Sequence, residues 1–502
     1  MKKTIALVLS LILLLSCLPL FAAAAETQTV PVIHIFGFMS SPIYEDTADE
    51  SSARLFPPEK DAILTMVKSL LPAVSSFTVT KNWNRFGDRL IPALNDLLLP
   101  VGNDEQGNAK GSTGVHFTYP TADEIRENGR ADFVYDWRDD PFVSAGALDA
   151  FVRYVTDDCG FGKAALECHS YGGIVTLTYL AVYGTGRIKS CCFNATAVFG
   201  AAFAGELMRG EVNLSADALA AFLEGILDQT EYEGLLKAVV SLFDDMGGLT
   251  FLCNFINDLF DHLSSRIWKE TIVPVFGNWL SVWSMVPDED LETAYNFVFS
   301  GIRDPDSADG KVFLARVGHF NAEIRTQRVA RLQTVNDRIN LYVVARYGYA
   351  GVPLGDIWMA NTDGVLNTES ESFGATCRGY TFSEPPETPL QLIAPNGAID
   401  ASTCLFPAQT WFVRNYKHTQ KDPAMDSFTA TLLTSDDQLT VDSLSQYPQF
   451  LYFDKVLRAL RPDVNQTAAA ATWQQDLKKL FRSLWERFLD LFLILLRTAV
   501  PG

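Results

Sequence analysis

The 502-residue sequence is short of basic residues and of histidine. It has 40 lysines and arginines against 60 aspartates and glutamates, and only six histidines. The formal net charge of −20 would repel phosphate groups, so the composition argues against a nucleic-acid partner. The small number of histidines also means that any chemistry needing an imidazole base has few candidates for it.

Metal-binding patterns are missing as well. The eight cysteines have no zinc-type spacing, and the many acidic residues form no EF-hand-type pattern. We therefore expect neither a resident metal nor an organic cofactor, although a calcium requirement stays open. No internal repeat or long low-complexity segment interrupts the chain, and 48% of its residues are apolar. These features fit one large domain that carries insertions.

The first residues have the pattern of a secretory signal peptide. Lys2 and Lys3 form a basic start, and an almost unbroken apolar stretch runs from Ile5 to Phe21. The small residues Ala22–Ala25 then offer a cleavage site, which makes residues 1–25 a signal peptide and the mature protein secreted or extracytoplasmic. An uncleaved membrane anchor and a lipoprotein-type cleavage within the same stretch are the alternatives.

Short apolar runs separated by helical patterns predict a mainly parallel sheet with helices on both faces. The expected strands are 31–37, 131–135, 163–169, 188–194, 339–347 and 410–416, with helical spacing at 147–155 and 171–182. The fold class is therefore α/β. The core comprises residues 26–202 and 301–465.

Residues 203–300 are predicted to be a helical insertion in this core. Helical periodicity recurs at 218–227, 234–243, 252–263 and 291–299, and no strand pattern is evident there. The helices have extensive apolar faces. The insertion is either a lid over an apolar pocket or a helical subdomain with an ordinary core of its own.

The C-terminal segment 472–502 is predicted to form an amphipathic helix. Leucine, phenylalanine and tryptophan fall on one face of Trp473–Arg497, and charged, largely basic residues fall on the other. The final apolar run, 491–496, is too short to span a bilayer. Contact with a membrane surface and docking onto the protein's own core are the two interpretations.

The most informative motif is Leu166-Glu-Cys-His-Ser-Tyr-Gly-Gly-Ile174, which places Ser170 between a predicted strand and a predicted helix. A sharp turn there would strain the serine backbone and expose its hydroxyl, which requires small neighbours such as Gly172. The following helix N-terminus offers N–H groups to a developing oxyanion. This pattern indicates the nucleophile elbow of a serine hydrolase, G-x-S-x-G, with Cys168 at the first glycine position. An ordinary serine in a buried turn is the alternative.

A serine nucleophile needs a base and an acid that orients the base, and in folds with the elbow these follow in the order serine, acid, histidine. His418, after the 410–416 strand, is the only histidine beyond the best acid candidates. Asp363, which precedes Gly364 in a turn-rich loop, is the preferred acid, and Asp356 in the same loop is the runner-up. A surface Asp-Gly turn is the alternative interpretation of Asp363.

Removal of the signal peptide would leave seven cysteines, an odd number, so at least one stays unpaired unless it bonds another chain. Cys168, next to the elbow, is the expected free thiol. Cys377 and Cys404 flank the later part of the predicted site and could form a disulfide.

Several motifs resemble those of lipid-ester enzymes. Val134-Tyr-Asp-Trp-Arg138 resembles the Y-D-W-R signature of the lecithin:cholesterol acyltransferase family, in which a helix and an H-S-x-G-G elbow follow. Phe36–Ser41 is similar to the H-G-F-x-x-S oxyanion loop of bacterial lipases, with Phe36 in place of the histidine. Asp363–Thr368 resembles the D-G-x-V-x-T run of secreted lipases. Weaker similarities occur at 194–204 and 282–287, so the resemblance spans about residues 30 to 420.

The resemblance implies an α/β-hydrolase fold with an inserted helical cap. It implies that Ser170 is the nucleophile, His418 the base and Asp363 the orienting acid, with backbone N–H groups of Phe38 and Tyr171 as the oxyanion hole. The expected function is a secreted lipase, phospholipase or esterase that forms an acyl-enzyme. The alternatives are an O-acyltransferase that passes the acyl group to an alcohol, and a non-catalytic lipid-binding protein on a hydrolase fold.

Overall fold

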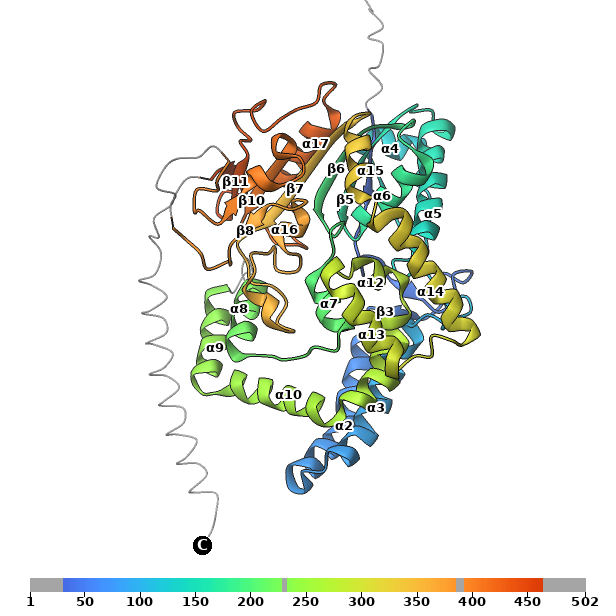
Figure 1. Cartoon of the computed structure of the whole chain (residues 1–502), viewed down its shortest axis with the longest axis vertical. Helices are drawn as coiled ribbons and strands as arrows, with labels where there is room; N and C mark the ends of the chain where they lie inside the picture. The colour runs from blue at the N-terminus through green and yellow to red at the C-terminus, as the bar shows by residue number, and fades with distance from the viewer. Residues whose placement is uncertain (1–29, 228–232, 385–391, 464–502) are drawn as a thin grey trace, which may run out of the picture.

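The computed structural model describes residues 30–227, 233–384 and 392–463 (Figure 1). The predicted signal peptide and the predicted C-terminal helix lie outside these residues. An eight-stranded sheet forms the centre of the upper part of the molecule in Figure 1, and a group of helices lies below it.

The sheet has the strand order β12-β11-β10-β7-β6-β5-β1-β4. Its strands are β1 (Val32–Ile35), β4 (Arg130–Phe133), β5 (Ala164–Ser170), β6 (Ile188–Thr196), β7 (Asn340–Tyr347), β10 (Thr410–Arg414), β11 (Phe450–Asp454) and β12 (Ala459–Pro462). All neighbours pair in parallel except β11 and β12. The carboxyl ends of seven strands therefore meet at one edge, where such sheets bind ligands. The predicted α/β class is confirmed.

The central strands are buried on both faces, because they are almost continuously apolar or small. Every residue of β6 except Lys189 is buried, and so is every residue of β7 after Asn340. Continuous rather than alternating burial is typical of a parallel sheet covered on both sides. All six strands expected from the sequence are present. The sequence did not predict β11 and β12, and β12 has an exposed Pro462, which an edge strand tolerates.

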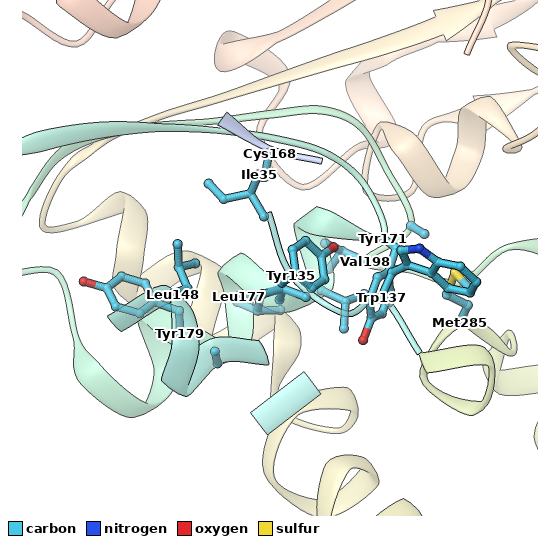
Figure 2. Close-up of a cluster of buried hydrophobic side chains, with 14 of the residues drawn as sticks. Ile35, Tyr135, Trp137, Leu148, Cys168, Tyr171, Leu177, Tyr179, Val198 and Met285 are labelled. Carbon is cyan, nitrogen blue, oxygen red and sulfur yellow. The ribbon is translucent and has the colours of Figure 1, made fainter. Parts of the chain in front are cut away.

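Helices cover the sheet on both faces. On one face, α5 (Pro141–Arg153) packs against α6 (Gly172–Tyr183), with α4 (Ala122–Asn128) beside β4. On the other face, α17 (Pro423–Thr434) packs on β5 and β6. Figure 2 shows part of the apolar cluster on the α5–α6 side, where Ile35 and Cys168 of paired strands lie together. Tyr171, Trp137 and Met285 gather at the right of that view.

Between β6 and β7 the described residues form helices and turns without a strand. The longer helices are α7 (Ala202–Met208), α8 (Ala216–Leu227), α9 (Glu233–Asp245), α10 (Gly248–Ile267), α12 (Leu280–Met285), α13 (Leu291–Gly301), α14 (Ala308–Phe320) and α15 (Arg328–Asn336). The helices predicted in the insertion correspond to α8, α9, α10 and α13. Because α14 and α15 continue the run to residue 336, the domain division at residue 300 stays a prediction.

A second helical pair, which the sequence did not predict, precedes β4. It consists of α2 (Lys60–Thr80) and α3 (Trp83–Leu98), and in Figure 1 it extends below the rest of the molecule. Aromatic rings hold it to α10: the Phe255 ring lies 5.7 Å from that of Trp83 and 6.1 Å from that of Phe77. Two small antiparallel pairs, β2 (Ile43–Tyr44) with β3 (Arg54–Phe56) and β8 (Thr376–Cys377) with β9 (Ile399–Asp400), complete the strands of the described residues.

The seven cysteines of the described residues are all free thiols. The Cys377–Cys404 bridge suggested by the sequence is not formed. The Cys377 thiol donates instead to the Ala375 carbonyl at 3.3 Å, and the Cys404 thiol donates to the Ala401 carbonyl at 3.1 Å. Both bonds are local, so neither sulfur is directed at the other.

Gly172 provides a test of how tightly α6 packs on the sheet. A Cβ atom there would meet the backbone oxygens of Ile35 and Phe36, the latter at 2.6 Å. We expect Gly172→Ala to lower the free energy of unfolding by about 1–3 kcal/mol, because rigid backbone cannot move aside. Gly318→Ala in α14 is the matched control, since nothing lies within 4 Å of its Cβ position. It should raise stability by about 0.5–1 kcal/mol in the same urea titration. Equal effects of the two changes would contradict this packing.

Candidate active site

Ser170 ends β5 in a conformation that an ordinary strand residue does not adopt. Its φ is +56°, in the left-handed region, and α6 begins two residues later. The pairing register with β6 shifts between His169 and Ser170, so the chain leaves the sheet at this residue. Strain of this kind costs on the order of 1–3 kcal/mol and persists only where the surroundings enforce it. The strained turn predicted for Ser170 is confirmed.

Glycines allow the neighbouring chain to approach the serine. A Cβ atom on Gly37 would overlap Ser170 and lie 2.8 Å from its Oγ. A Cβ atom on Gly173 would lie 2.7 Å from the Cγ2 of Thr196. The loop after β1 and the first turn of α6 are therefore pressed against the elbow, which requires the residues without side chains that the sequence supplies.

Cys168 is accommodated within the sheet rather than crowding the turn. Its side chain is fully buried, and its thiol donates to the Cys192 carbonyl at 3.4 Å. The residue pairs in register with Ile35 and Phe193, and Figure 2 shows it beside Ile35. A residue larger than glycine therefore fits at this position because its side chain joins an apolar layer.

His418 and Asp363 form a buried pair. The His418 Nδ1 atom lies 2.5 Å from Asp363 Oδ2, and the His418 backbone N–H donates to the Asp363 carbonyl at 2.9 Å. The other carboxylate oxygen of Asp363 accepts the N–H groups of Val365 and Leu366 at 2.9 and 2.8 Å. Asp363 is 1% exposed, so its Asp-Gly turn is not a surface turn. The runner-up Asp356 is exposed, at the start of a short 3₁₀ turn (Asp356–Met359).

The electrostatics of the pair favour an ionised Asp363. Burial by itself raises the pKa of this carboxyl, but the charge and hydrogen bond of His418, with a further hydrogen bond from Glu371, hold the pKa well below its usual range. An ionised Asp363 accepts the Nδ1–H of His418. The tautomer with a proton on Nδ1 leaves Nε2 as the basic nitrogen.

The loop that carries His418 is fastened to the elbow strand and to β7. The His418 carbonyl accepts hydrogen bonds from Arg346 Nη1 at 2.7 Å and from His169 Nε2 at 2.9 Å. The rings of His169 and His418 lie 4.5 Å apart, which brings His418 to the residue next to Ser170. Burial, with the nearby His418 and Arg346, lowers the pKa of His169 well below its usual value, so this imidazole is neutral and positions the loop.

Arg346 and His169 are site residues that the sequence did not predict. Alternation along a strand points neighbouring side chains to opposite faces, and nothing local indicates that His169 contacts a loop 249 residues further along. A signal for Arg346 existed, because it is the one charged residue in an otherwise apolar or polar strand. A buried charge in such a place requires hydrogen-bond partners.

The Y-D-W-R motif braces the predicted oxyanion loop. Tyr135 donates its hydroxyl to the Phe36 carbonyl at 2.7 Å, and Trp137 donates its indole N–H to the Ser41 carbonyl at 2.9 Å. The Phe38 ring packs edge-on against Trp137 at 4.9 Å and against Tyr171 at 6.4 Å. The motif thus fixes the loop that contains Phe38 beside the start of α6, while the role of its N–H group stays a prediction.

A third ionisable group lies beside the pair. Glu371, at the end of α16 (Thr368–Glu371), is fully buried, and its Oε2 accepts the backbone N–H of Arg346 at 2.6 Å. One ligand-type atom each of Asp363, Glu371 and His418 lie within 4.8 Å of one another. The 2.5 Å contact between Nδ1 and Oδ2 is a hydrogen-bond distance, however, and a metal held by both atoms at about 2 Å would keep them farther apart. The trio therefore fits a shared proton better than a metal ion.

No family model matches the chain, and no curated protein matches it. Among solved structures, it matches part of one described as the crystal structure of the Tle4–Tli4 complex, with 16% identity and a TM-score of 0.19. The match covers 36% of this chain and 48% of the other, so the chain spans about half of the matched protein. A likeness of this extent carries no argument about activity, and the candidate site rests on its own geometry.

The two aspartates of the acid-bearing loop can be compared directly. Asp363→Asn should lower kcat for a chromogenic ester by about 10³–10⁴-fold, because an amide no longer favours the required His418 tautomer. Asp356→Asn should keep kcat within about twofold, because exposed substitutions away from the site have small effects. Circular dichroism would verify that both variants are folded. A large loss in Asp356→Asn with a small loss in Asp363→Asn would overturn the assignment.

Proposed function

We propose that this protein is a serine carboxylic-ester hydrolase that acts on lipid esters. The proposal rests on one observation: a serine with a left-handed backbone ends β5 at the sheet edge where a buried Asp363–His418 pair is fastened. A strained serine and an oriented imidazole at one edge of a parallel sheet are the parts that acyl transfer requires.

The reaction would proceed by acyl transfer through Ser170. His418 Nε2 takes the hydroxyl proton as Oγ attacks the ester carbonyl, while Asp363 stabilises the resulting imidazolium. Backbone N–H groups of Phe38 and Tyr171 would hold the tetrahedral oxyanion, each contributing about 3 kcal/mol of barrier lowering. Collapse of this intermediate expels the alcohol, which takes the proton from His418. Water, activated by His418 in the same way, then releases the acid.

An exposed apolar surface supports lipid as the substrate class. The helix α2 is 21 residues long and apolar enough to cross a membrane by length and composition, yet only 11% of its most apolar window is buried. The large apolar side chains exposed along it are Ile63, Leu64, Val67, Leu71, Val74 and Val79. Phe251 and Leu252 of the adjoining α10 are also exposed. Several large apolar side chains exposed along one helix fit contact with lipid.

Access to the serine would require movement. Ser170 is 7% exposed, so an acyl chain reaches it only when the covering residues open. The helices between β6 and β7 are the candidate lid, since α7 follows the carboxyl end of β6 and α12 packs against α7. The Ala201 N–H donates to the Met285 carbonyl at 2.7 Å, which ties this segment together close to the sheet edge.

A fluorophosphonate probe tests the nucleophile directly. Wild-type protein should be labelled covalently, and Ser170→Ala should not, because the probe reacts only with an activated hydroxyl. Ser69→Ala, which removes an exposed serine on α2, is the control and should be labelled like the wild type. Equal labelling of Ser170→Ala and wild type would place the reactive hydroxyl elsewhere and overturn the assignment of Ser170. No labelling of either would favour the non-catalytic lipid-binding alternative.

Product analysis separates hydrolysis from transfer. With phospholipid vesicles alone, we expect free fatty acid and lysophospholipid, because water reaches the acyl-enzyme. Adding a sterol or a long-chain alcohol should leave free fatty acid as the main product. An acyl ester of the added alcohol as the main product would assign the protein to the O-acyltransferase alternative.

A further inference from the structure

Glu371 is a fully buried acid that no basic side chain contacts by a hydrogen bond in the part of the chain that the structure describes. The nearest cation, the Arg346 guanidinium, donates instead to the carbonyls of Lys417 and His418 and to Asn194 Oδ1. Arg346 offers Glu371 its backbone N–H, which Oε2 accepts. An isolated buried carboxylate is costly, so a neutral acid is the expected form.

The neighbouring Asp363 makes a second negative charge still less favourable. Asp363 is already ionised, since it accepts hydrogen bonds from His418 and from two backbone N–H groups. One carboxyl oxygen of Glu371 lies within 4.8 Å of one of Asp363, and two carboxyl groups this close do not both ionise in a buried site. The Oε1 atom of Glu371 is buried and has no donor among the described residues, which leaves it free to carry the proton. Burial and the Asp363 charge raise the pKa of Glu371 well above its usual value.

We propose that Glu371 is a neutral carboxylic acid whose Oε1–H donates a hydrogen bond to the Asp363 carboxylate, making Glu371 a positioning residue of the site. This inference rests on the proposed function. Asp363 is then held by donors on several sides: two backbone N–H groups, the Glu371 hydroxyl and His418. Its rotation is fixed, so Oδ2 stays directed at Nδ1. Glu371 touches neither the ester nor Ser170 and acts only through Asp363.

Ionisation of Glu371 would disturb this arrangement. The titratable and charged groups that face it are Asp363 and His418 from the loops after β7 and β10, Arg346 on β7 and the Cys377 thiol on β8. Loss of its proton at alkaline pH would place two negative charges side by side and remove the donor. Because the pKa of Glu371 is raised, activity should persist through neutral pH and fall only when this proton dissociates.

The test compares three variants at the end of α16. Glu371→Gln is neutral at every pH and keeps a donor, so its kcat near neutral pH should stay within about threefold of wild type, and its alkaline fall should be reduced or lost. Glu371→Leu has no donor, and its kcat should fall by at least about tenfold with KM little changed, because Asp363 is no longer fixed. Glu369→Gln, on the same helix but exposed, should match wild type in rate and pH profile.

Several outcomes would overturn the proposal. One is a loss of kcat in Glu371→Gln as large as that in Glu371→Leu. Another is a Glu371→Gln variant whose activity falls at alkaline pH as in the wild type. A third is full activity in Glu371→Leu. If Glu371→Leu does not fold, the pH profiles of Glu371→Gln and wild type still decide.

A spectroscopic readout separates this proposal from the proposed function. Infrared spectra of Ser170→Ala at mildly alkaline pH should contain the carbonyl band of a protonated carboxylic acid, and Ser170→Ala/Glu371→Gln should lack it. The absence of that band would refute the neutral acid even if Ser170 proves to be the nucleophile. If the band is present but fluorophosphonate does not label the wild-type protein, only the proposed function is refuted.

Discussion

The hydrogen bonds of one buried arginine hold the candidate site together. Arg346 is 3% exposed, and its guanidinium bonds the carbonyls of Lys417 and His418 and the side chain of Asn194. Its backbone N–H bonds Glu371, and its carbonyl accepts the Thr368 hydroxyl at 2.8 Å. A charge buried this deeply is costly without hydrogen-bond partners, so the acceptors of Nη1 and Nη2 are constrained in turn, while Nε has no partner among the described residues. Strand β6 and the loops after β7 and β10 thereby acquire one common arrangement.

The elbow depends on a different constraint, the absence of side chains. Gly37 lets the loop after β1 approach Ser170 more closely than a Cβ atom would allow. Gly172 and Gly173 do the same for the start of α6, which approaches the backbone of Ile35 and Phe36 and the side chain of Thr196. Ser170 can keep its left-handed backbone because these contacts surround it. The charged network around Arg346 and the close packing around Ser170 meet at His169, whose ring contacts His418. Strain and electrostatics thus converge at one edge of the sheet.

Much of the fold could be predicted from the sequence, because its signals are local. Apolar runs bounded by turns predicted β1, β4, β5, β6, β7 and β10 to within a few residues, and helical spacing predicted α8, α9, α10 and α13. The helix α2 was not predicted, since it is apolar on more than one side and gives no single-faced pattern. The helix α3 does have an apolar pattern on one face, which was overlooked. The edge strand β12 was missed because its residues are half-buried or exposed and give little apolar signal. The apolar run of β11 was overlooked, although this strand is mostly buried and pairs on both sides.

The sequence by itself determined the motif around Ser170 at the junction of β5 and α6, the order Ser170, Asp363, His418, and the glycines that a tight turn needs. Each depends on residues that are adjacent or ordered along the chain. Only the tertiary structure paired His418 with Asp363 rather than Asp356, left Cys377 and Cys404 unbridged, and placed Glu371, Arg346 and His169 around His418. These contacts join segments tens to hundreds of residues apart. Their partners are selected by the sheet order and by the requirement that buried polar groups be bonded, and neither leaves a pattern along the chain.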